Sequence, residues 1–118
     1  MIRVTVHGVP TEMRVEAVLK DICCAVAMAD MRGAVKEENV HAHYSDKPPD
    51  AVVGRNIVAI VEGLEEGWSR ENKEQLIPMV GFILRRHFSI LYTVACHIVR
   101  PVSGVELSGV WAPKLIRV

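Results

Sequence analysis

The chain shows the same succession of apolar and polar positions twice, first over residues 2–44 and again over residues 57–99. Residues 2–9 alternate between apolar and polar side chains, which predicts a strand with one covered face. Residues 12–29 carry apolar side chains at helical spacing, which predicts a helix lying on a sheet. Residues 40–44 alternate again, so a second strand is expected after the helix.

The second half repeats this pattern with more clearly marked element ends. Residues 57–61 are apolar and mostly β-branched, which is typical of a strand covered on both faces. Ser69 stands where a helix N-cap is expected, because its hydroxyl can accept a hydrogen bond from a first-turn amide. The helix should close at Arg85–His87, whose positive charge suits the negative end of the helix dipole. A fourth strand is expected over residues 91–99.

Short sequence matches indicate a duplication. Val6-His7-Gly8 resembles Val61-Glu62-Gly63, and Val40–His43 resembles Val94–His97, each about 55 residues further on. We therefore expect one domain over residues 1–118, in which each half of the repeat forms a β-α-β unit. Its parts are a first unit over 1–46, a loop over 47–55, a second unit over 56–102 and a C-terminal tail over 103–118.

The predicted fold class is α/β (α+β). The order β-α-β-β-α-β predicts a four-stranded mixed sheet with two helices on one face, plus a C-terminal strand segment. Two architectures satisfy this order: a ferredoxin-like sandwich, or two parallel strand pairs joined across a pseudo-twofold axis. The second would leave one sheet face open for oligomer packing. The tail is expected to pair with the sheet edge of a neighbouring subunit.

Composition narrows the possible partners. Half of the residues are hydrophobic and the formal net charge is zero, which argues against nucleic acid or an anionic membrane as a partner. No apolar run reaches about 18 residues, and the chain opens directly on a strand pattern, so neither a spanning helix nor a signal peptide is expected. Cys23, Cys24 and Cys96 lack metal-ligand spacing and predict free thiols in a reducing cytoplasm.

Two stretches carry a resemblance to a known family. Gly67-Trp68-Ser69-x-Glu71-x-Lys73 resembles the G-R-S-x-E-x-K entry to a helix in the tautomerase superfamily. The opening stretch MIRVTVHGVP, residues 1–10, resembles the first strand of proteins of the macrophage migration inhibitory factor type, including the Val-Pro pair that ends it. Chain length and the extended C-terminal segment resemble the 5-carboxymethyl-2-hydroxymuconate isomerase branch.

This resemblance implies a homotrimer and an enol–keto isomerase that acts on an unsaturated or keto carboxylic acid. It also implies a catalytic N-terminal proline, whose amine moves a proton between carbon and oxygen. The sequence departs from the family here, because Met1 stands where that proline is expected and bulky Ile2 disfavours removal of Met1. The candidate proton carrier is therefore the primary amine of Met1, whose ordinary pKa is about 7.7–8.0. Whether the protein is an active enzyme stays open at this point.

Two cations are candidate substrate-binding residues. Arg3 shares the polar face of the first strand with the N-terminal amine, where it would bind a carboxylate and lower the pKa of the amine. The alternative for Arg3 is a salt bridge between subunits. Lys36 lies before the second strand, roughly where the family often has a basic residue for the substrate carboxylate. The alternative for Lys36 is a solvated surface lysine.

Four histidines are expected on the sheet face that the helices leave open: His7, His41, His43 and His97. They are candidates for a pocket, for a polar or pH-sensitive subunit interface, or for a metal-binding oligomer, the third candidate function. Trp111 is a candidate pocket or interface residue. The preferred reading assigns no metal and no cofactor. The second candidate function is a non-catalytic trimeric binding or structural protein of the same fold.

Overall fold

The computed structural model describes residues 2–46, 56–64, 67–88, 92–100 and 104–112, so Met1 and the predicted loop 47–55 lie outside the described residues. The predicted order of elements is confirmed, with a fifth strand in the tail. The elements are β1 (Ile2–His7), a short 3-10 helix (Thr11–Met13), α1 (Glu16–Ala29), a second 3-10 helix (Glu37–Asn39), β2 (Val40–Tyr44), β3 (Asn56–Glu62), α2 (Arg70–Phe88), β4 (Thr93–Arg100) and β5 (Gly104–Trp111).

The five strands form one sheet in the order β2-β1-β3-β4-β5. β1 pairs in parallel with β2, and β3 pairs in parallel with β4, while β1 and β3 are antiparallel neighbours at the centre. In a ferredoxin-like sandwich another strand splits each β-α-β unit. Here the two strands of each unit are adjacent, so the structure has the second predicted architecture, two parallel pairs joined across a pseudo-twofold axis.

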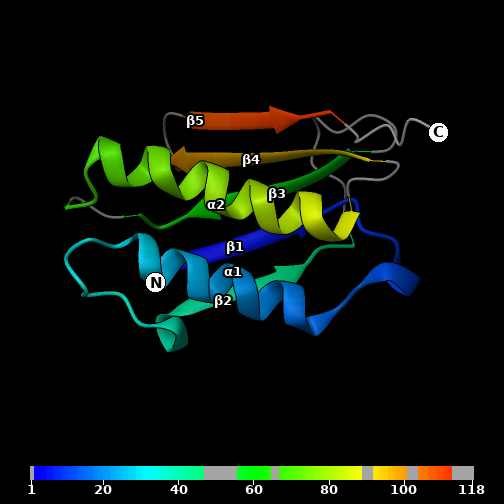
Figure 1. Cartoon of the computed structure of the whole chain (residues 1–118), viewed down its shortest axis with the longest axis horizontal. Helices are drawn as coiled ribbons and strands as arrows, with labels where there is room; N and C mark the ends of the chain where they lie inside the picture. The colour runs from blue at the N-terminus through cyan, green and yellow to red at the C-terminus, as the bar shows by residue number, and fades with distance from the viewer. Residues whose placement is uncertain (1, 47–55, 65–66, 89–91, 101–103, 113–118) are drawn as a thin grey trace.

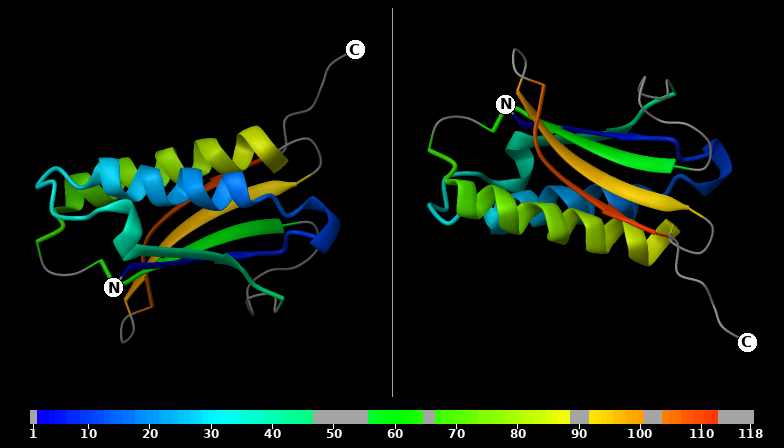
Figure 2. Two further views of the ribbon diagram at one scale, coloured as in Figure 1. Left: turned by 90° about the horizontal axis from the view of Figure 1, so that it is seen from below. Right: turned by 90° about the horizontal axis from the view of Figure 1, so that it is seen from above.

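Both helices cover the same face of the sheet (Figures 1 and 2). The core lies between the two layers and is filled by side chains with no exposed surface, such as Ile22 of α1, Ile57 of β3 and Leu76 of α2. The alternation in β1 is the predicted one, with Val4 and Val6 in this core and Arg3 on the opposite, open face. None of the described helices is long and apolar enough to cross a membrane.

The repeat is visible in backbone conformation as well as in sequence. Gly8 follows β1 with a φ of 88°, and Gly63 follows β3 with a φ of 84°. A side chain disfavours this left-handed region, so glycine suits both positions. At Gly8 a Cβ atom would also overlap the carbonyl oxygen of Asn56. The first strand of each unit is therefore followed by a glycine in the same left-handed conformation.

The ends of the helices agree with the sequence at one point and correct it at another. The Ser69 hydroxyl accepts a hydrogen bond from the Asn72 amide at 3.1 Å, which confirms the predicted N-cap of α2. The first helix, however, begins at Glu16 and not near residue 12. Its N-cap Val15 is extended because Tyr44 of β2 holds it: the Tyr44 hydroxyl donates to the Val15 carbonyl at 2.6 Å and accepts from the Val15 amide at 3.1 Å.

The tail forms the fifth strand of the sheet. β5 pairs antiparallel with β4 of its own chain and stands at the end of the strand order, so pairing of the tail with a neighbouring subunit's sheet edge stays a prediction. A register shift after Ile98 places Glu106 at an irregular position, where it accepts hydrogen bonds from Lys73 of α2 and from Arg100 of β4 at 3.0–3.1 Å. These bonds hold the pKa of the Glu106 carboxyl below its usual range, despite the opposing effect of burial. The charged group ties the tail strand to the second unit.

Trp111 at the end of β5 fits into a slot that two glycines leave open. A Cβ atom at Gly81 of α2 would overlap the Trp111 ring, and one at Gly109 would stand 2.7 Å from it. The ring therefore packs against helix backbone, which fixes β5 against the helix layer. Trp111 is a packing residue here and does not line the pocket described below.

The packing of Trp111 against Gly81 predicts that a substitution which usually stabilises helices destabilises this one. Gly81→Ala would ordinarily stabilise a helix by about 1 kcal/mol. Here it should lower the free energy of unfolding by about 1–3 kcal/mol, because the methyl group collides with Trp111. The measurement is urea unfolding of Gly81→Ala with and without Trp111→Ala. Stabilisation by Gly81→Ala in both backgrounds would contradict the described contact.

Candidate functional site

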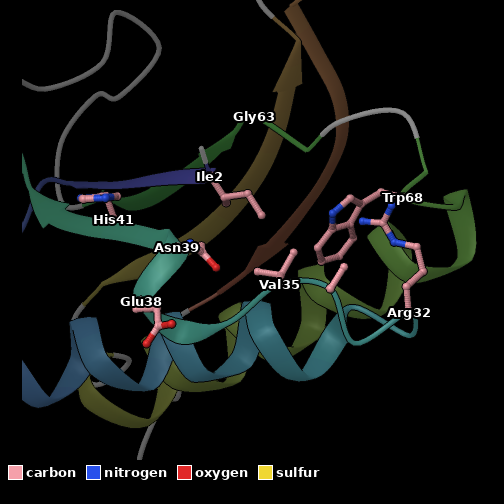
Figure 3. Close-up of a pocket in the computed structure, with 9 residues that line it drawn as sticks. Ile2, Arg32, Val35, Glu38, Asn39, His41, Gly63 and Trp68 are labelled. Atoms are coloured by element: carbon pink, nitrogen blue, oxygen red, sulfur yellow. The ribbon is translucent and has the colours of Figure 1, made fainter.

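A pocket of about 410 Å³ opens where β1 and β2 begin and β3 ends (Figure 3). Its walls come from the first strand, from the segment between α1 and β2, and from the turn between β3 and α2. The lining residues are Ile2, Arg32, Ala34, Val35, Glu38, Asn39, His41, Gly63 and Trp68. In the view of Figure 3, Arg32 and Trp68 stand at one end, with Glu38 and His41 at the other.

The topology brings these distant residues together. Because β1 and β2 are parallel, with Ile2 opposite Val40, the segment that leads into β2 arrives at the start of β1. Because β3 is antiparallel to β1, with Glu62 opposite Arg3, its end and the following Gly63 reach the same edge. The pocket therefore forms around the first described residue of the chain, Ile2.

A buried carboxylate organises the wall next to Arg32. The Asp30 side chain has no exposed surface and accepts hydrogen bonds from the amides of Arg32, Ala34 and Val35 at 2.8–3.2 Å. It also accepts one from Arg32 Nε at 3.0 Å. Burial alone would raise the pKa of Asp30, but these bonds outweigh it and the pKa lies below its usual value. Asp30 is therefore an ionised group that fixes the turn after α1.

Arg32 is the cation of this pocket. Its guanidinium packs against Gly67, at a position where any side chain on Gly67 would overlap Nη1. Gly67 has a φ of 114°, which also favours glycine. The Arg32 side chain remains 44% exposed, so a ligand can reach it.

The other walls are mixed. Ile2 and Trp68 are buried in the core and Val35 packs against it, so they give the pocket an apolar floor. Glu38 and His41 are exposed and add a carboxylate and an imidazole. The pocket therefore has a cation at one end, a carboxylate and an imidazole at the other, and apolar residues between them. This arrangement suits a small organic anion.

The site residues predicted from the sequence lie at different distances from this pocket. Met1 lies outside the described residues, but its neighbour Ile2 lines the pocket. Arg3 is exposed on the open face of β1, between His41 of β2 and Glu62 of β3 in the register of the sheet. Lys36 is exposed directly before the second 3-10 helix. Neither Arg3 nor Lys36 lines this pocket.

The four candidate histidines share the open face but do not converge within one chain. His43 and His97 lie in one row of the sheet, separated by Thr5 and Ile60, which puts them about 14 Å apart at the usual strand spacing. His7 lies one row away, opposite Val58. In the part of the chain that the structure describes, no three His, Cys, Asp or Glu residues come close enough to hold a metal ion.

A second hollow lies on the outer side of the helix layer. It is lined mainly by apolar residues of α1 and α2, including the exposed Met28 and Phe82. No arginine, lysine or histidine lines it, and Asp21 is its charged group. It therefore suits an anionic ligand less well than the pocket at Ile2.

Sequence reasoning missed Arg32, Glu38 and Asn39 as pocket residues. The signal that points to them is position: in a β-α-β unit the segment before the second strand returns to the start of the first. The Asp30-x-Arg32-Gly33 turn marks where that return begins, since Gly33 has a φ of 68°. Trp68, the residue before the Ser69 cap, also lines the pocket.

Comparison with solved structures identifies the fold. A structure of the protein Pt0534, inactivated by 2-oxo-3-pentynoate, is 15% identical, with a TM-score of 0.57 over 88% of this chain and 93% of that one. A fused 4-OT (4-oxalocrotonate tautomerase), described as a wild-type asymmetric trimer, is 17% identical, with a TM-score of 0.60 over 86% of this chain and 93% of that one. No protein-family model and no curated protein sequence matches the chain. The chain has the fold of the tautomerase superfamily, as the sequence resemblance predicted.

His97, on the open face of the sheet, predicts that the free energy of unfolding depends on pH. Its Nδ1 atom is buried without a hydrogen-bond partner in the described structure, and burial lowers its pKa from the ordinary value of 6.5. The unfolded chain therefore takes up this proton first as the pH falls below about 6.5, which destabilises the fold. The loss of unfolding free energy between about pH 7.5 and pH 5.5 should be smaller in His97→Gln than in the wild type. Equal losses in chemical denaturation would contradict this assignment.

Proposed function

We propose that this protein is an enol–keto tautomerase-like isomerase of a small unsaturated or keto carboxylic acid. The observation that carries the proposal is the pocket at the start of β1, which combines a reachable cation, Arg32, with an apolar floor. The reaction moves one proton: an enol oxygen loses it and a carbon gains it. It needs a base and acid at one position and an anchor for the carboxylate, but no redox partner.

The proton carrier in this proposal is the amine of Met1. Met1 directly precedes the pocket residue Ile2 in the chain. An amine that loses water on entering a pocket, or that lies near a cation, has a lowered pKa and is a better base near neutral pH. The primary amine here replaces the secondary amine that the resemblance leads one to expect.

The sequence proposed Arg3 and Lys36 as the carboxylate-binding residues, but neither of them lines the pocket within one chain. A cytoplasmic location also belongs to the proposal, and the free thiols of Cys23, Cys24 and Cys96 support it. The runner-up function is a non-catalytic binding protein of the same fold. It is favoured by the methionine at the position of the expected proline.

A substitution of Met1 distinguishes the isomerase from the non-catalytic binding protein. We expect Met1→Pro, made behind an extra initiator methionine that the cell removes, to raise activity on phenylpyruvate well above wild type, because it supplies a secondary amine and keeps Ile2 in β1. Met1→Ser, trimmed in the same way, is the matched control with a primary amine and should show no such gain. Mass spectrometry verifies each chain start, and ketonisation is followed by ultraviolet absorbance.

Two outcomes of this experiment would contradict the isomerase proposal. If all three forms lack activity on phenylpyruvate and on a hydroxymuconate up to their solubility limits, the isomerase proposal fails and the binding protein becomes the better account. A gain in the serine control equal to that of the proline variant would show that amine class is irrelevant, which contradicts the assigned role.

We also propose that the chain forms a homotrimer through the open sheet face. That face carries apolar side chains that remain accessible, namely the half-buried Ile60 of β3 and, on β5, Val105, which is 57% exposed, and Val110, which is 63% exposed. A single chain leaves the two valines of β5 uncovered, and the similar fused 4-OT is described as a trimer.

The assembly proposal predicts a mass and a variant that lowers it. Sedimentation at micromolar concentration should give three times the 13.1 kDa chain mass. Val110→Asp should shift the protein to monomer, because it places a charge in the proposed contact at a position that costs one chain little. Met31→Asp, at a loop residue that is 74% exposed, should leave the trimer intact. A wild-type monomer, or equal effects of the two substitutions, would contradict a trimer built on this face.

A further inference from the structure

The turn after α1 carries a charged arrangement that the sequence-based assignment did not use. Arg32 belongs to the pocket wall, and its Nε atom donates to the fully buried Asp30 at 3.0 Å. The backbone amide of Arg32 donates to the same Asp30 oxygen at 3.2 Å. Two bonds to one immobile carboxylate therefore hold both the main chain and the guanidinium of this residue.

The Nη1 atom of the guanidinium fills a space that is open because residue 67 is a glycine. Nη1 occupies the space beside Gly67 that any side chain there would fill, so the group lies between the Asp30 turn and the turn before α2. In the described structure no hydrogen bond engages either Nη atom. These two nitrogens are the pair that binds a carboxylate with two parallel hydrogen bonds. The Arg32 side chain as a whole is 44% exposed, so a ligand can approach it from the pocket.

We propose that Arg32 binds the carboxylate of the pocket's ligand and that Asp30 is its positioning residue, an inference that rests on the proposed function. Trp68, Val35 and Ile2 contact the apolar body of the ligand, which extends from Arg32 toward Glu38 and His41 (Figure 3). Asp30 orients the guanidinium before the ligand arrives, so little side-chain entropy is lost on binding. This assigns to Arg32 the role that the sequence gave to Arg3 and Lys36.

The choice of Arg32 over the other two cations follows from their positions. Lys36 is exposed and precedes the second 3-10 helix, and no charged partner fixes its ammonium group in the described structure. Arg3 is exposed on β1, next to the pocket residue His41 in the register of the sheet, but it does not itself line the pocket. Only Arg32, among these three, lines the pocket.

The test compares an anionic probe with its neutral counterpart. Calorimetry measures the dissociation constants of cinnamate and cinnamamide, which share an apolar body and differ in charge. We expect Arg32→Gln to weaken cinnamate binding by about 10- to 100-fold and cinnamamide binding by less than about threefold. Arg3→Gln and Lys36→Gln are the matched controls and should each change cinnamate binding by less than about threefold.

The role of Asp30 needs a readout other than stability. In Asp30→Asn the carboxylate charge is lost and an NH₂ group faces backbone donors, so the preference for cinnamate over cinnamamide should fall at least about fivefold. The Arg32 Nε–H resonance should be protected from solvent exchange in the wild type, because this group donates to Asp30, and should lose that protection in Asp30→Asn. Gly67→Ala gives a second route, because its methyl group displaces Nη1 without altering Asp30. It should lower the same preference while the Asp30 turn stays formed.

Several outcomes would overturn the inference. If cinnamate binding survives Arg32→Gln, or is lost in Arg3→Gln or Lys36→Gln instead, the inference is wrong and the isomerase proposal still stands. If Asp30→Asn and Gly67→Ala weaken both probes equally, Asp30 has only a structural role. If wild-type protein binds no cinnamate up to about 10 mM, the assigned ligand class fails. The activity of the Met1→Pro variant then decides separately whether proton transfer remains.

Discussion

The parallel pairing of β1 with β2 determines where the segments that form the pocket come together. Helix α1 runs back over the sheet, so the segment between α1 and β2 lies at the start of β1. That segment carries a cation and a buried carboxylate, and the antiparallel β3 brings its own end to the same edge. The pocket is thus a product of topology, and its chemistry comes from the residues that happen to stand in two turns.

Asp30 shows how a buried charge can be stable and useful together. An isolated carboxylate in this position would be strongly disfavoured by loss of water. Three backbone amides and one guanidinium nitrogen replace that water, so the charge keeps its ionised form and the turn keeps its shape. By contrast, Cys96 is buried in the core without charged partners, and burial raises the pKa of its thiol to about 12, which leaves it protonated and unreactive.

The periodic parts of the fold could be predicted from the sequence, because strand alternation, helix spacing and the Ser69 cap each have a local physical cause. Features that depend on contact between distant residues could not. The start of α1 is set by Tyr44, far along the chain, and the tail strand is held by Lys73 and by the slot beside Gly81. The same reason explains why Arg32 was missed: its role depends on Asp30 and Gly67 around it, not on any motif.

NMR shifts of the backbone amides and the tryptophan indoles, followed as cinnamate is added to the wild-type protein, test directly whether a small carboxylic acid binds in the pocket around Ile2. We expect the largest changes on the Trp68 indole and on the amides of Val35 and Gly63, which line the pocket. Changes centred on the hollow at Met28 and Phe82, or on the open sheet face, would contradict it.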